Sequence, residues 1–178
     1  MADDVNTPRH SDLAFVVARI AVDREPHWLL RRHAKWGDWS LVGGHVEADE
    51  REDWLRAARR EAEEELEPLR HGVDFDVQPM PTSTTSWGPV ASRSVAGTPT
   101  TYRVRWFVLS FLSDPGDCLA KLSPDDFLLV PESKLLVRDD VSDVTSRLLE
   151  TLHGDPASIP LAGRIPIARA PHRLAATT

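Results

Sequence analysis

The chain has 178 residues, of which 41% are hydrophobic and 28% are charged, a composition typical of a soluble globular protein rather than a disordered or fibrous one. This length suits one domain with a sizeable core. The formal net charge of −7 excludes a general surface for a nucleic-acid polymer or an anionic membrane. A small phosphorylated ligand stays compatible with that charge, because a bound cation reverses the local sign.

Cysteine content and the N-terminal sequence bear on the cellular location. Cys118 is the single cysteine, so an intramolecular disulfide and a thiolate zinc cluster are both excluded, and we interpret it as a buried or incidental thiol. Residues 1–11 are acidic and polar, without the apolar stretch of a signal peptide, and no apolar run approaches the roughly 18 residues that span a membrane. We therefore predict a cytoplasmic protein with a flexible lead over residues 1–11.

The first predicted elements are two strands that form a hairpin. Residues 13–22 are rich in β-branched side chains and suit a buried strand, and residues 27–33 form a second strand pattern. The segment from Asp23 to Pro26 supplies the turn between them. Residues 36–50 are predicted to be a loop that contains a short extended piece.

A helix is predicted from about Asp49 onward, because apolar residues there recur every four positions, as in a helix with one buried stripe. Asp49 and Glu52 suit a start resembling a capping box, and Pro68 lies beyond the end. Glu61 and Glu65 lie at the border of the stripe rather than opposite it, which suits ligands at the edge of a cleft. The predicted stripe consists of Trp54, Ala58, Ala62 and Leu66, with Leu55 alongside.

The second half of the chain is predicted to add strands and a closing helix. Residues 73–80 suit a strand ahead of a mobile loop, and residues 101–112 carry the strongest strand pattern of this half. Residues 113–117 break that strand, and residues 127–131 suit another. A helix over 141–153 is predicted to point these side chains inward: Val141, Val144, Leu148, Leu149 and Leu152.

The domain organisation predicted from these elements is simple. The chain shows no internal repeat and no second domain, so we predict one domain over residues 12–162. Residues 163–178 contain several Arg, Pro and Ala residues, and we predict a tail there that is weakly ordered or peripheral.

Four acids in five residues, at 61–65, are the most informative feature of the chain. On a helix, Glu61 and Glu65 stand one above the other and Glu64 lies beside them, so three carboxylates suit a hard cation such as Mg²⁺, which in such sites usually acts on phosphates. Glu63 is expected to be a solvated neighbour. The alternative is an ordinary solvated helix face, since Glu-rich helices are common.

The spacing around this run resembles the signature of the Nudix hydrolase family, G-x5-E-x7-R-E-U-x-E-E-x-G-U, where U is a bulky apolar residue. Gly44, five intervening residues and Glu50 match the first part, and the run from Arg60 to Glu65 matches the central part. Nine residues separate Glu50 from Arg60, where the family has seven. Glu52 has the family's distance to Arg60 but lies two residues too far from Gly44. Glu67, followed by Pro68, stands at the position of the family's late glycine.

The resemblance implies an α/β/α sandwich with a mixed β-sheet and a divalent metal site. It implies Mg²⁺, with Mn²⁺ as a substitute, bound by Glu61 and Glu65 with help from Glu64 and the carbonyl of Gly44. Arg60 would orient the acids as their internal counter-charge, and Glu50 would be the first acid of the motif. One acid of the cluster, or another from a loop, would be the general base.

The function that the resemblance implies is metal-dependent hydrolysis of a diphosphate linkage in a nucleoside diphosphate joined to another group, or in a related phosphorylated metabolite. The first alternative is a non-catalytic Nudix-like domain that binds or senses a ligand, which the two extra residues favour. The second is a plain interaction domain with an acidic surface helix. We expect a small phosphorylated metabolite or nucleotide as partner, no nucleic-acid polymer and no membrane. Because the family often dimerises, a homodimer stays open.

Candidate substrate contacts lie just before the motif. Arg31 and Arg32, with His33 and Lys35 beside them, form a basic cluster that suits phosphate oxygens, or equally a solvated strand end. Trp39 suits stacking on a base, as do Trp36 and Trp87, although packing at the core or its rim is the commoner role of a tryptophan. Arg103 and Arg105 share one strand face, and that face is at least as consistent with solvent as with phosphate. We interpret His45 as structural.

Overall fold

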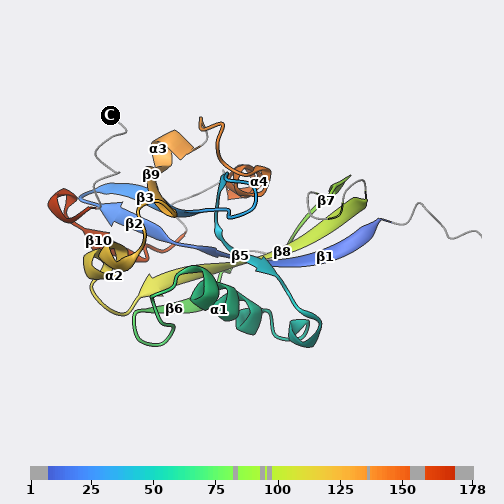
Figure 1. Cartoon of the computed structure of the whole chain (residues 1–178), viewed down its shortest axis with the longest axis horizontal. Helices are drawn as coiled ribbons and strands as arrows, with labels where there is room; N and C mark the ends of the chain where they lie inside the picture. Colours follow the sequence, from blue (N-terminus) through green and yellow to red (C-terminus); the bar gives the residue numbers. More distant parts are fainter. Residues whose placement is uncertain are drawn as a thin grey trace, which may run out of the picture.

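Two five-stranded β-sheets with helices on both sides form the protein (Figure 1). The computed structural model describes residues 8–81, 84–92, 95, 98–135, 137–152 and 159–170. The first sheet has the strand order β5-β1-β8-β6, and β7 also pairs with β8. Its strands are β1 (Arg9–Val17), β5 (Val42–His45), β6 (Phe75–Pro79), β7 (Thr85–Ala91) and β8 (Pro99–Phe111).

The second sheet has the order β10-β2-β3-β4, and β9 also pairs with β3. It consists of β2 (Arg19–Val22), β3 (Glu25–Arg32), β4 (Trp39–Ser40), β9 (Phe127–Pro131) and β10 (Gly163–Ile165). Each sheet is mixed, because β1 runs parallel to β8 and β10 runs parallel to β2, whereas the other pairs are antiparallel.

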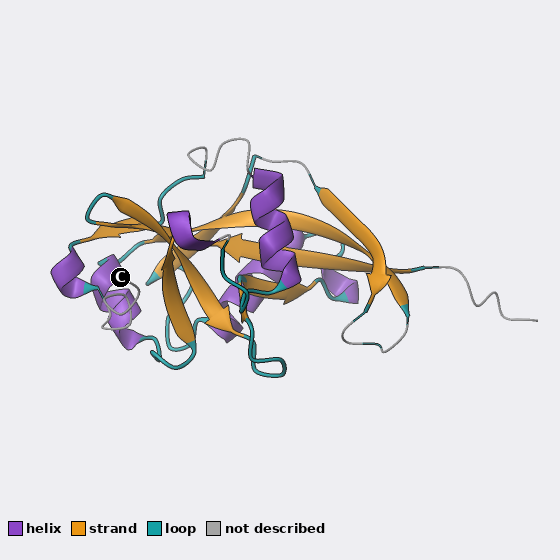
Figure 2. Ribbon diagram, turned by 90° about the horizontal axis from the view of Figure 1, so that it is seen from above, coloured by secondary structure: helices purple, strands orange, loops and turns teal. Residues whose placement is uncertain are grey.

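The helices lie on both sides of the strands, as Figure 2 shows. Helix α1 (Trp54–Glu65) follows the 3₁₀ turn η1 (Ala48–Glu50) and packs on the first sheet. The remaining helices are α2 (Pro115–Lys121), α3 (Glu132–Leu135), α4 (Asp143–Leu152) and η3 (Ile167–Arg169). No helix in the described part of the chain is long and apolar enough to cross a membrane.

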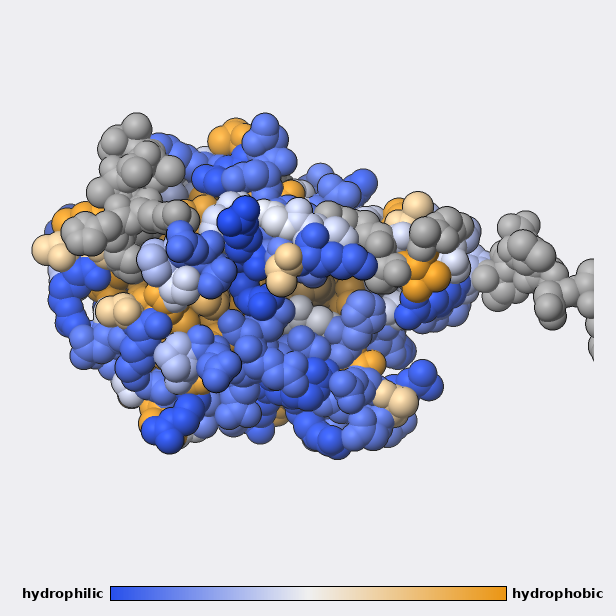
Figure 3. Space-filling model, viewed as in Figure 1, coloured by the Kyte–Doolittle hydropathy of each residue, from blue (hydrophilic) through white to orange (hydrophobic). Residues whose placement is uncertain are grey.

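Apolar side chains form two clusters, one on each side of the strands. One cluster joins α1 and α2 to residues such as Val16 and Phe107. The other gathers Phe15 and Trp106 of the first sheet with Trp28 of the second. Charged and polar side chains cover most of the surface seen in Figure 3. The arrangement confirms the predicted α/β/α class, with two mixed sheets where one was expected.

The predicted hairpin is confirmed, but its first strand is divided. Strands β2 and β3 pair antiparallel around a turn at Asp23 and Arg24. The predicted strand 13–22 is interrupted at Ala18, where the chain leaves the first sheet and enters the second. Its two halves therefore pair with different partners, β1 with β5 and β8, and β2 with β3 and β10.

The acidic helix begins later than predicted. Asp53 caps it by accepting a hydrogen bond from the Arg56 N–H at 3.0 Å, and Asp49 belongs to η1 instead. The predicted start at Asp49 and Glu52 is therefore wrong, because Asp53 holds the capping position. The buried stripe is confirmed, and Ala57 joins it: Trp54, Ala57, Ala58, Ala62 and Leu66 are all buried.

Both predicted ends of the domain need correction. Strand β1 already begins at Arg9, inside the predicted lead, and residues 1–7 lie outside the described part. Strand β10 pairs with β2 and buries Ile165, so residues 163–165 are part of a sheet rather than a loose tail. Residues 171–178 lie outside the described part.

The other predicted elements of the second half are largely confirmed. Strands β6, β8 and β9 correspond to the three predicted strands. Residues 113–117 do end β8, but Asp114 then caps the unpredicted helix α2 by accepting from the Asp117 N–H. Helix α4 matches the predicted 141–153 segment, and Val141 is buried. The side chains of Leu148, Leu149 and Leu152 lie outside the described part.

We predict that Gly43→Ala destabilises the fold strongly, because Gly43 has a φ of +131° and an added Cβ would lie 2.2 Å from the Ala14 carbonyl oxygen. Strain and overpacking together should lower the free energy of unfolding by about 3 kcal/mol. Gly72→Ala is the matched control, since Gly72 also has a positive φ, +76°, but no atom lies within 4 Å of the added Cβ.

Urea denaturation of both variants measures the difference. The control should lose about 1 kcal/mol, the cost of left-handed backbone at one residue. Equal losses in the two variants would show that β5 does not lie tightly against β1.

Candidate active site

Two glycines on β5 allow a carboxylate to lie against the strand backbone. Strand β5 pairs with β1, where Phe15 faces Gly43 and Ala14 faces Gly44. A Cβ on Gly44 would lie 2.6 Å from Oε2 of Glu61, so any larger residue would displace that carboxylate. Because Gly44 has no side chain, the carboxylate of Glu61 can lie directly against the backbone of β5.

The buried stripe of α1 decides how far each acid is covered. Because Ala58 and Ala62 pack against the sheet, the side chains of Glu61 and Glu65 are only 13% and 18% exposed. The side chain of Glu64 is 61% exposed, and Glu63 is exposed as well. Glu61 and Glu65 thus lie at the border of the buried stripe, as predicted, and Glu64 extends into solvent.

Arg60 connects the parts of the site. Its Nε and Nη2 donate to Oε1 and Oε2 of Glu50 at 2.9 and 3.0 Å, a two-pronged ion pair. Its Nη1 donates to Glu61 at 2.9 Å and more weakly to Glu64 at 3.4 Å. Its Nη2 also donates to the carbonyl of His45, next to Gly44, at 3.0 Å. A single guanidinium therefore joins η1, α1 and β5.

Glu50, not Glu52, is the partner of Arg60. The side chain of Glu50 is only 1% exposed, and it also accepts from the Glu47 N–H at 3.0 Å. Glu52 is exposed and lies outside this network. The turn η1 and the capping residue Asp53 hold the chain between Glu50 and the helix, so the two extra residues leave the ion pair intact.

The replaced glycine at the end of the motif has a similarly local effect. Helix α1 ends at Glu65, and the Leu66 N–H still bonds to the Ala62 carbonyl at 3.0 Å. Among the described residues other than glycine, only Asp23 has a positive φ, so the position of Glu67 needs no left-handed backbone and Glu67 fits where a glycine is common.

Glu65 has partners of its own. Its Oε2 accepts from the Gly43 N–H at 2.8 Å, and its Oε1 accepts from Nη1 of Arg31 on β3 at 2.7 Å. Arg31, predicted as a phosphate contact, is thus inside the site and bound to an acid. No sequence pattern predicts this pair, because β3 and the end of α1 are far apart along the chain.

Burial and ion pairs shift the pKa values of these acids in opposite directions. Burial raises the pKa of Glu65 to about 7, although the Gly43 N–H and Arg31 oppose it, and burial also raises the pKa of Glu61. Hydrogen bonds from Arg60 lower the pKa of Glu50, and those same bonds raise the pKa of Arg60. The two acids nearest Gly44 therefore carry a charge that their surroundings destabilise.

These acids fit a divalent cation in the type of donor atom that they offer. Carboxylate oxygens are the ligands that Mg²⁺ prefers, and a cation would offset the unfavourable burial of Glu61 and Glu65. Among the described residues no three acidic, histidine or cysteine side chains are gathered in a metal-binding cluster. Arg60 and Arg31 instead hold the two carboxylates, so metal binding requires Arg31 to share or release Glu65.

The other predicted contact residues have different surroundings. Arg32 is exposed on β3, paired in register with Trp39 of β4. Trp39 is half-buried and packs against the cluster around Trp28, so the structure gives it a packing contact at the core's edge. Trp36 stacks on His33, with ring centroids 4.0 Å apart. Burial, with a smaller contribution from Arg9, lowers the pKa of His45, whose carbonyl rather than its ring contacts Arg60.

Comparison with known families decides the identity of this motif. A model of the NUDIX domain matches residues 11–139, which is more than half of the chain. The chain belongs to the Nudix family. Its Nudix box runs from Gly44 to Leu66, lengthened by two residues before α1. A search of curated proteins gave no match.

Solved structures share the fold at low sequence identity. The Ap4A hydrolase of C. elegans is 17% identical, with a TM-score of 0.55 over 81% of this chain and 96% of that one. A mutT/nudix family protein of Listeria innocua is 19% identical, with a TM-score of 0.53 over 84% and 94%. Shewanella oneidensis NrtR, solved with a 27mer DNA, is 15% identical, with a TM-score of 0.55 over 80% and 60%, so this chain spans less than two thirds of NrtR.

We predict that Glu50→Gln lowers the free energy of unfolding by about 2 kcal/mol at neutral pH, because it removes the charge from two hydrogen bonds with Arg60. Glu52→Gln should change it by less than about 0.5 kcal/mol, since Glu52 is exposed. Chemical denaturation of both variants measures the difference, and an equal effect would remove Glu50 as the partner of Arg60.

The contribution of Glu50 should also depend on pH with a definite sign. Because its pKa is lowered in the folded protein, its stabilisation is fully present above its ordinary value of 4.5 and is lost as pH falls through the lowered pKa. The stability difference between wild type and Glu50→Gln should therefore shrink below about pH 4.5. A difference that grows on acidification would contradict this sign.

Proposed function

We propose that this Nudix domain is a Mg²⁺-dependent hydrolase of a phosphoanhydride bond, acting on a nucleoside diphosphate joined to another group or on a related phosphorylated metabolite. Membership of the family and a fold shared with an Ap4A hydrolase support a Nudix hydrolase in general. The metal and the substrate class are our proposal. Mn²⁺ is a candidate substitute for Mg²⁺, and Glu61, Glu64, Glu65 and the Gly44 carbonyl are the proposed ligands.

The Arg60 network is the observation that carries this proposal. The two extra residues between Glu50 and Arg60 could have moved Glu50 out of reach of Arg60. Instead, Arg60 bonds to Glu50, to Glu61 and to the carbonyl next to Gly44, all at 2.9–3.0 Å. The two extra residues therefore leave the contacts around Arg60 intact, which supports the proposal.

Each side chain has a proposed part in the reaction. A bound Mg²⁺ would supply a Lewis acid that neutralises the diphosphate and favours ionisation of the attacking water. Arg60 fixes Glu61 against Gly44, and Glu50 keeps Arg60 in place. Arg31, once it releases Glu65, is positioned to meet phosphate oxygens. Glu64 would use a carboxylate oxygen that does not hold the metal to accept the proton of the attacking water. The water oxygen forms the new bond to phosphorus as the bridging P–O bond breaks, and the leaving phosphate group takes the bonding electrons.

A regulatory domain that binds a ligand without turnover is the second candidate. The ion pair between Arg31 and Glu65 at 2.7 Å favours it, because it places a protein cation on one of the proposed metal ligands. NrtR, a fold neighbour, was solved bound to DNA, but its likeness at 15% identity extends only to the fold. A homodimer also stays a prediction that rests on the family resemblance.

Chromatographic detection of the phosphorylated products formed from a panel of compounds separates the two candidates. The panel contains nucleotide sugars, dinucleoside polyphosphates, which include the class named for the C. elegans neighbour, and (deoxy)nucleoside triphosphates, each with Mg²⁺ and with EDTA. Turnover that EDTA abolishes supports the hydrolase. Ligand binding by calorimetry without turnover supports the regulatory domain, and absence of both turnover and Mg²⁺ or Mn²⁺ binding would sink the enzyme proposal.

We predict that Glu61→Gln and Glu65→Gln each lower turnover by about 100-fold or more, because each removes a negative charge from the proposed metal site. Glu63→Gln is the matched control on the same helix, since Glu63 is exposed. Steady-state kinetics with Mg²⁺ gives the comparison, and circular dichroism shows that each variant is folded. Full activity in both of the first two variants would remove Glu61 and Glu65 from the site.

A further inference from the structure

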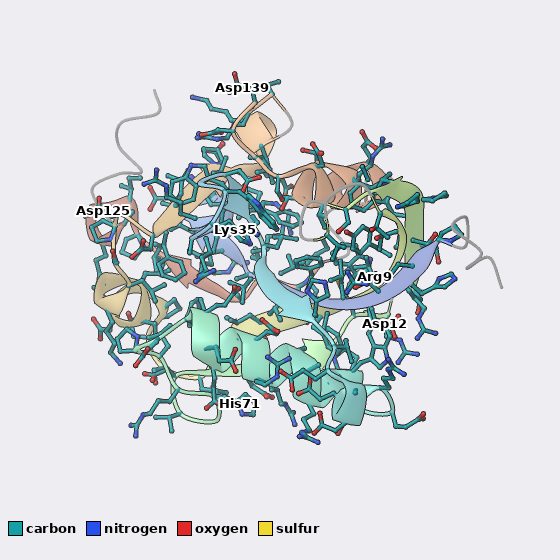
Figure 4. The ribbon with its side chains drawn as sticks, turned by 45° about the vertical axis from the view of Figure 1, so that its right-hand side comes forward. Arg9, Asp12, Lys35, His71, Asp125 and Asp139 are labelled. Carbon is teal, nitrogen blue, oxygen red and sulfur yellow. The ribbon has the colours of Figure 1, made fainter. Side chains whose placement is uncertain are left out.

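A hollow of about 900 Å³ lies beside the Nudix box, where β1, β7 and β8 extend beyond the start of α1 (Figure 1). We call it the β1 hollow. The first half of β1 forms one wall, and His45, Val46 and Arg51 form another. Figure 4 shows Asp12 on the side of β1 that faces the start of α1, and Arg9 on the same strand across the ribbon from Asp12. The polar and charged residues that line the β1 hollow are Arg9, His10, Ser11, Asp12, His45, Arg51, Ser86, Thr101 and Arg103.

The charge of the β1 hollow is opposite to that of the chain as a whole. Among the residues that the structure describes, three arginines and two histidines line it, and Asp12 is the one acid. Arg103 neutralises Asp12 through two hydrogen bonds of 2.9 and 2.7 Å. Within the described residues, neither Arg9 nor Arg51 forms an ion pair. Two arginines without an ion pair to any described residue therefore line one hollow in a protein of net charge −7.

Trp54 contacts Arg103 of the hollow and the backbone of Arg51. The guanidinium groups of Arg103 and Arg105 lie over its ring, 5.1 and 4.6 Å from the centroid. Its indole N–H donates to the Arg51 carbonyl at 3.0 Å, which ties the backbone that carries Arg51 to the first turn of α1. Arg51 therefore extends from backbone that is fixed relative to α1.

Strand β5 leads directly from the proposed metal site into the hollow. Gly44 borders Glu61, and the next two residues, His45 and Val46, line the hollow. The Val46 N–H bonds to the Asp12 carbonyl at 3.0 Å, so this part of the chain also lies against β1. Two residues of extended strand span about 7 Å, a distance that one extended phosphorylated metabolite covers.

We propose that the β1 hollow is a subsite for a phosphate group of the ligand, lying beyond the bond that is cleaved. Arg9 and Arg51 bind the phosphate by charge-assisted hydrogen bonds, and the hydroxyl groups of Ser86 and Thr101 complete the lining. The assignment of this phosphate to the substrate rests on the proposed function. The phosphate group of a free phosphate compound would bind in the β1 hollow through the same contacts.

Binding of inorganic tripolyphosphate in the presence of EDTA tests the subsite without catalysis. The acids of the Nudix box repel this anion when no metal is present, so calorimetry reports on basic sites. The Arg9→Gln/Arg51→Gln variant should bind it about tenfold more weakly than wild type. The Arg24→Gln/Arg164→Gln variant is matched in charge and removes two exposed arginines outside the hollow, so it should bind within about twofold of wild type.

Equal affinity of the two double variants, or no binding by the wild-type protein, would overturn the subsite. Glu61→Gln, expected to lack turnover, should still bind tripolyphosphate, so a failed hydrolase and a failed subsite give different results. Kinetics on nucleoside triphosphates and the corresponding diphosphates identifies the source of the phosphate. A KM that rises about tenfold in Arg9→Gln/Arg51→Gln only for the longer compound supports the substrate. Unchanged KM values for both would overturn that assignment and leave a free phosphate compound as the ligand.

Discussion

The ion pair between Arg60 and Glu50 is the interaction on which the site depends. Glu50 is almost completely buried, and burying a carboxylate is costly unless a cation pairs with it closely. Arg60 provides that cation with two hydrogen bonds and uses its remaining donors on Glu61 and the His45 carbonyl. The turn before α1, the helix and β5 are therefore fixed relative to one another by a single side chain.

Close packing of small residues places that network next to the sheet. Ala58 and Ala62 let α1 approach the strands, and Gly44 lets the carboxylate of Glu61 lie on β5. The same approach partly buries Glu61 and Glu65 and raises their pKa values. The packing that brings Glu61 and Glu65 to the site is thus also the cause of their unfavourable burial. A divalent cation would offset the cost of that burial. The β1 hollow, which lies at the His45 end of β5, is lined mainly by positively charged side chains, in contrast to the acids of the Nudix box.

Local sequence patterns predicted most of the fold. The four-residue repeat from Trp54 to Leu66 gave the acidic helix, and the β-branched residues gave the hairpin. The errors fall where non-local pairing decides. The break at Ala18 exists because its two flanking strands pair in different sheets, and residues 163–165 are ordered because β2 offers them a partner. Asp53 caps α1 in place of Asp49. The apolar repeat of the helix does not determine which of these two acids is the cap.

The sequence by itself determined which acids of the box share a face of α1, since the spacing of residues along one helix fixes the direction of each side chain. It left two acids, Glu50 and Glu52, as partners for Arg60. Only the tertiary structure decided between them, because the answer depends on which carboxylate is buried beside the guanidinium. The pair of Arg31 with Glu65 and the gathering of Arg9 and Arg51 in one hollow were likewise decided by tertiary structure, because sheet pairing joins segments far apart in the chain.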